Sequence, residues 1–141
     1  MHIVWQKKYN VNVLEIDEQY RNLVESFNGL VRLVKRGVAS SEVTARVDLV
    51  KSQIQNCFSI EELYFQKLGF NDIGQYRQAH SACMLQLSAF RQNYDPQQPL
   101  INLAHIEGIA STLLEHIASS HTEFNTYMKE NRLRTFMKAH A

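Results

Sequence analysis

The chain has 141 residues, of which 45% are hydrophobic, and its 15 Lys and Arg residues nearly balance its 14 Asp and Glu residues. This length and composition predict one globular domain over residues 1–141. The formal net charge of +1 is spread along the chain. A chain with this distribution of charges is not expected to have a basic surface that binds nucleic acid or an anionic membrane.

No apolar segment approaches the roughly 20 residues that cross a bilayer, and the N-terminus lacks the apolar core of a signal peptide. We therefore expect a cytoplasmic protein without a membrane partner. The two cysteines, Cys57 and Cys83, are too few for a disulfide framework and are not spaced like zinc ligands. Reduced thiols are expected.

Apolar residues recur at helical spacing in four segments, which are separated by the few glycines and prolines. The pattern predicts helices over 17–36, 41–68, 72–93 and 99–118. An irregular arm of 11 residues precedes them, and a short amphipathic helix over 119–141 follows. Short connections make consecutive helices antiparallel, so the predicted fold is an all-α, up-down-up-down four-helix bundle.

Several polar residues occupy core positions of these helices, and Glu61 is the clearest. A buried carboxylate without a partner costs several kcal/mol or takes up a proton. Antiparallel order puts the start of the first and third helices beside the finish of the second and fourth. One layer at that end of the bundle should therefore contain six residues: Tyr20, Cys57, Glu61, Tyr76, His80 and His116.

A family pattern runs through Trp5, Tyr9 and Val11, then IDEQYRNL at 16–23, CFSIEE at 57–62, GFN at 69–71 and HI at 116–117. Over nearly its whole length the chain resembles bacterial hemerythrins. The resemblance implies a four-helix bundle whose end layer holds two irons through five histidines and two bridging carboxylates, and which binds O2.

Three of the seven ligand positions implied by the resemblance are kept, as Glu61, His80 and His116. The other four hold Tyr20, Cys57 and Tyr76 in place of histidines, and His121 in place of a bridging aspartate. An imidazole cannot bridge two metals as a carboxylate does. We therefore do not expect a normal diiron O2 carrier.

The kept residues supply two imidazoles and one carboxylate, a donor set associated with non-heme Fe(II). Tyr76 and His121 are further candidate ligands, and Tyr20 and Cys57 are secondary ones. The resemblance thus predicts a remodelled, mononuclear iron site that senses or handles O2, NO or peroxide. Zinc is the alternative metal.

The same residues also allow a layer without metal, in which the tyrosine hydroxyls and imidazole N–H groups donate to Glu61. The chain would then be a scaffold or regulatory module and would signal through a separate protein partner. A third alternative is a redox-active thiol at Cys57. No enzymatic activity is expected, because the sequence contains no nucleophile elbow, phosphate loop or dinucleotide motif.

Overall fold

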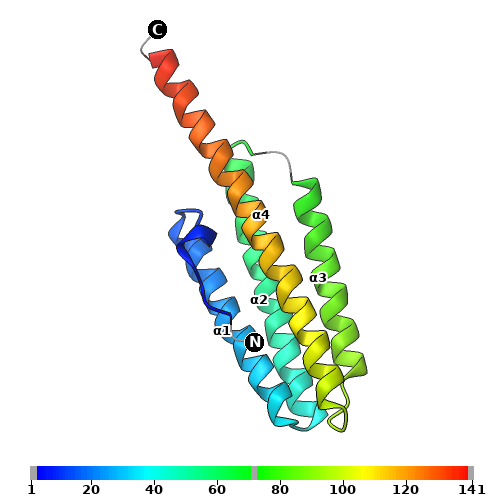
Figure 1. The fold of residues 1–141 in the computed structure, drawn as a ribbon. Coiled ribbons are helices and arrows are strands. Elements are labelled where there is room, and N and C mark those ends of the chain that lie inside the picture. Colours follow the sequence, from blue (N-terminus) through cyan, green and yellow to red (C-terminus); the bar gives the residue numbers. More distant parts are fainter. Residues whose placement is uncertain (1–2, 71–72, 140–141) are drawn as a thin grey trace.

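The computed structural model describes residues 3–70 and 73–139. Within them lie the 3-10 helix η1 (Lys7–Tyr9) and the helices α1 (Leu14–Arg36), α2 (Ser40–Lys67), α3 (Gly74–Asn93) and α4 (Pro99–Ala139). Helices α1 and α3 each pack against both α2 and α4, which gives the predicted antiparallel four-helix bundle (Figure 1). Over the described residues, no helix is both long and apolar enough to cross a bilayer.

The helices end where the sequence predicts breaks. Gly37 follows α1 with a φ of 64°, and Gly69 follows α2 with a φ of 79°. This left-handed conformation suits glycine, which has no Cβ, and it lets the chain reverse. Pro99 opens α4, where its missing N–H removes no hydrogen bond. The predicted start of α3, residue 72, lies outside the described residues.

The C-terminal segment differs from the prediction. Of the predicted segment 119–141, residues 119–139 do not form a separate short helix, because α4 runs without interruption to Ala139 and extends past the other three helices (Figure 1). No glycine or proline follows Gly108, so nothing in the sequence ends the helix near Ser119. Phe124 is only 1% exposed, so the turn after Ser120 does cover the end of the core as predicted.

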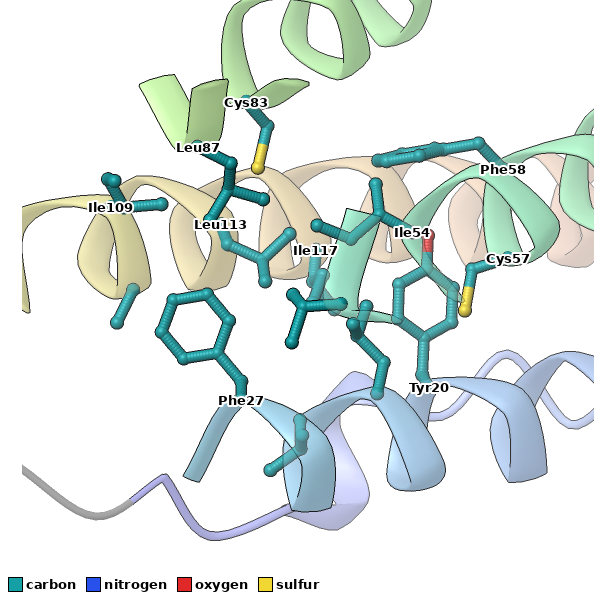
Figure 2. Close-up of a cluster of buried hydrophobic side chains, with 14 of the residues drawn as sticks. Tyr20, Phe27, Ile54, Cys57, Phe58, Cys83, Leu87, Ile109, Leu113 and Ile117 are labelled. Carbon is teal, nitrogen blue, oxygen red and sulfur yellow. The ribbon is translucent and has the colours of Figure 1, made fainter. Parts of the chain in front are cut away.

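Side chains from all four helices form one apolar core. Figure 2 shows Phe27 of α1, Ile54 of α2, Leu87 of α3 and Leu113 of α4 pointing into it, and Tyr20 lies toward one end. Burial of each such side chain contributes about 1.5–3 kcal/mol to folding. The buried polar residues Glu61 and His121 are therefore surrounded by apolar side chains.

The N-terminal arm is held to α1 by hydrogen bonds. The Asn28 side chain donates to the carbonyl oxygen of Ile3 at 2.7 Å and accepts the N–H of Ile3 at 2.8 Å. The carboxylate of Asp17 accepts the N–H groups of Val11 at 2.9 Å and Asn12 at 3.1 Å. These bonds fix both ends of the arm, so its backbone lies in a defined position over the bundle.

We predict that Asn28→Ala weakens the fold, because it leaves the N–H and C=O of Ile3 without partners. The expected loss in the free energy of unfolding is about 1–3 kcal/mol. Urea denaturation followed by the fluorescence of Trp5, the single tryptophan, measures it. Asn22→Ala is the matched control, because Asn22 is exposed on the same helix. Equal stability of the two variants would contradict this role of Asn28.

Candidate functional site

Glu61 of α2 is fully buried and forms the centre of the polar layer. Tyr20 of α1 and Tyr76 of α3 both donate their hydroxyl hydrogens to Glu61 Oε2, and the Tyr76 bond is 2.9 Å long. Nε2 of His121 in α4 lies 2.7 Å from the other oxygen, Oε1, as an ion pair. Both oxygens of the carboxylate are thus engaged by groups from the other three helices.

The pattern of donors indicates the charge of the Glu61–His121 pair. Oε2 accepts two hydroxyl hydrogens, an arrangement that stabilises the carboxylate form. Nδ1 of His121 bonds to the carbonyl oxygen of Tyr9, which is only an acceptor, so Nδ1 must carry a hydrogen. Nε2 faces the carboxylate of Glu61 as an ion pair, which favours the imidazolium form of His121.

The surroundings favour the same protonation states. Burial alone would lower the pKa of His121, but the charge of Glu61 and the bonds to Glu61 and to the Tyr9 carbonyl raise this pKa above its ordinary value of 6.5. Burial and, next, the charge of Glu61 raise the pKa of Tyr20 and of Tyr76 well above 10. Both tyrosines therefore stay neutral hydrogen-bond donors.

The other two histidines of the predicted site pack around Phe58. Its ring stacks on His80 with the centroids 4.3 Å apart, and its centroid lies 5.2 Å from that of His116. His80 is half-buried, whereas burial lowers the pKa of His116 to about 4 and keeps its imidazole neutral. Nε2 of His116 is buried without a hydrogen-bond partner.

Cys57 is a buried free thiol next to the layer, close to Tyr20 in Figure 2. Burial and the charge of Glu61 raise the pKa of Cys57 to about 12. At neutral pH such a group contains almost no thiolate, the form that reacts with oxidants and electrophiles. The geometry therefore does not favour the redox alternative.

The predicted ligands do not fit a metal ion in this arrangement. Protein donors engage both oxygens of Glu61, and the Phe58 ring packs against His80 and His116. In the described part of the chain, no group of three or more His, Cys, Asp or Glu side chains is placed to hold a metal. Iron binding stays a prediction of the resemblance.

The structure brings together Tyr20, Glu61 and Tyr76, as helix order predicts, and it adds His121. Two further participants were not predicted, the ring of Phe58 and the carbonyl group of Tyr9. Phe58 lies three residues before Glu61 and so shares its helix face, which the sequence could have revealed. A backbone carbonyl acceptor leaves no such signal.

No family model, curated protein or solved structure matches this chain. The hemerythrin resemblance rests on the residues quoted for it in the sequence.

We predict that Tyr20→Phe and Tyr76→Phe each destabilise the protein by about 1.5–3 kcal/mol, because each removes a hydrogen bond to a buried carboxylate. Tyr64→Phe is the matched control. It also removes a tyrosine–glutamate hydrogen bond, of 2.7 Å to Glu15, but an exposed one, and should change the stability little. Chemical denaturation measures all three, and equal losses would contradict the buried layer.

His116 and His121 should give the stability opposite slopes with pH. His116, with a pKa of about 4, binds fewer protons folded than unfolded, so its contribution rises from about pH 4 to about 6.5. His121, with a raised pKa, contributes fully below 6.5 and loses its contribution as the pH rises through its folded value.

Denaturation curves across this range test both slopes. We expect His116→Gln to remove part of the rise and His121→Gln to remove part of the fall above pH 6.5, each relative to the unmodified chain. A fall that persists unchanged in His121→Gln would show that its imidazolium is not the group responsible.

Proposed function

We propose that this chain is a metal-independent, hemerythrin-like bundle that acts as a regulatory binding module rather than as an enzyme. The observation that carries the proposal is the set of protein groups around Glu61, two hydroxyl donors on one carboxylate oxygen and an imidazole in ion-pair contact with the other. Tyr20, Tyr76 and His121 surround a carboxylate that the resemblance assigns to a bridge between irons. Hydrogen bonds and one imidazolium charge thus serve where that family uses metal cations.

Burial supports a role other than catalysis. Glu61 and His121 are each 0% exposed, so no reactant reaches the charged pair. A layer closed to solvent can instead hold the helices in one arrangement. A buried polar network drawn from four helices favours a single core packing over its alternatives.

The link from the layer to the arm supports a regulatory role. His121 contacts Glu61 through one ring nitrogen and the backbone of Tyr9 through the other. Any change in the layer that turns this imidazole also removes a bond that holds the arm. The arm is therefore the element through which a separate protein partner would sense the state of the core.

The mononuclear iron site is the second candidate, and one observation favours it. Nε2 of His116 is buried and unpartnered, and the neutral imidazole is free to accept a cation. Glu61 and His80 would have to give up their present contacts to join it. The site would then hold iron, or zinc in its place, and bound iron would take a small diatomic ligand.

Metal analysis separates the two candidates. Tag-free protein expressed with added iron should contain no stoichiometric metal by ICP-MS and should be colourless. Its melting temperature should be the same with and without EDTA, because a metal that binds only the folded state must add stability.

Glu61→Gln provides the matched comparison. If the protein binds no metal, Glu61→Gln should lower the stability equally in iron-free and iron-supplemented samples. The reason is that the substitution weakens the ion pair with His121 in both samples. About one iron per chain, with a melting temperature that EDTA lowers, would overturn the proposal in favour of the iron site.

A further inference from the structure

A cavity of about 280 Å³ lies between α3 and α4, at the end of the bundle that contains the polar layer. Tyr76 and His116 line it, whereas Glu61 and His121 do not. Its volume is close to the lower limit of ligand pockets, about 300 Å³. The cavity thus suits a small molecule that reaches the layer only through Tyr76 and His116.

Three aromatic rings line the inner part of the cavity. Phe65 is the middle one, with Phe70 at 5.1 Å and an angle of 79°, and Tyr76 at 5.4 Å and an angle of 67°. All three side chains are buried. The π faces of such rings attract organic cations.

Two buried polar atoms of the cavity wall have no protein partner, Nε2 of His116 and Oγ of Ser120. Ser120 is only 9% exposed, so its hydroxyl is largely shielded from bulk solvent. Leaving such groups unpaired costs free energy, and they lie one helical turn apart on α4. A ligand with N–H donors would supply hydrogens to both atoms.

The charges of the cavity wall have one sign. Glu115 and Glu123 of α4 line it and are exposed, and no lysine or arginine is among the lining residues. The carboxylates lie two turns apart on the same helix face. They favour a positively charged ligand.

We propose that this cavity binds a small primary alkylammonium ion. Its N–H groups donate to His116 and Ser120, its charge is neutralised by Glu115 and Glu123, and its carbon chain packs on the aromatic rings. The inference goes beyond the proposed function and rests on it in one respect, that His116 is not occupied by a metal.

Titration of EDTA-dialysed protein with butylammonium chloride at pH 7, followed by ¹H–¹⁵N NMR, tests the proposal. A primary amine is protonated at this pH. We expect saturable shifts at the cavity residues. 1-Butanol, which has the same length but no charge, and tetramethylammonium, which has no N–H, should each bind at least about tenfold more weakly.

Three variants test the residues. Ser120→Ala should weaken butylammonium binding about tenfold, because it removes a hydrogen bond to a charged group. The double variant Glu115→Gln/Glu123→Gln should weaken it about threefold or more. Glu18→Gln, a matched charge change at an exposed position of α1 outside the cavity, should leave it unchanged.

The variants should remain folded. The hydroxyl of Ser120 has no partner in the protein, so Ser120→Ala should keep or raise the melting temperature while it weakens binding. The absence of saturable binding, equal binding of 1-butanol or tetramethylammonium, or an equal loss in Glu18→Gln would each overturn the proposal.

The metal content of the same sample separates this inference from the proposed function. Protein that contains stoichiometric iron and binds butylammonium after EDTA treatment overturns the proposed function and retains the cavity. Metal-free protein that binds no ammonium overturns the inference alone.

Discussion

The carboxylate of Glu61 is fully buried toward one end of the bundle, and the arrangement of the surrounding helices depends on compensating its charge. Desolvation of a carboxylate is costly enough that it must be paired or neutralised. Here the compensation is divided between two tyrosine hydroxyls and the imidazole of His121. Because each donor comes from a different helix, the layer cross-links all four helices at one height.

A buried ion pair is weak evidence for stability, since its desolvation can cancel the attraction between its charges. Its value in this bundle is better described as specificity. A rotation of any helix would separate a donor from Glu61 and leave a buried charge without its partner. The layer thereby selects one register among the many packings that an apolar core of Leu, Ile and Phe side chains would tolerate.

The sequence predicted four helices, their order and the layer at which their polar residues meet, because the spacing of apolar residues indicates helices and short connections make consecutive helices antiparallel. It could not predict which side chains touch. His121 lies five residues after His116, about 140° further around α4, so it is on a different face. It is buried because α4 contacts α1 as well as α3, and only the family resemblance drew attention to this position.

The sequence also could not predict the positions of the His80 and His116 rings, which both pack against the ring of Phe58. The continuation of α4 was missed for a simpler reason. A pair of serines does not end a helix, and the sequence around Ser119 and Ser120 contains no residue that does.

This continuity makes α4 a single uninterrupted helix with two parts. His116, Ser120 and His121 lie inside the bundle, and the same helix projects beyond it (Figure 1). From Ser120 to Ala139 the helix spans about 28 Å. Any tilt of α4 about the cavity is enlarged along this length. A given tilt at the polar layer would displace the protruding end by more than it displaces the buried part.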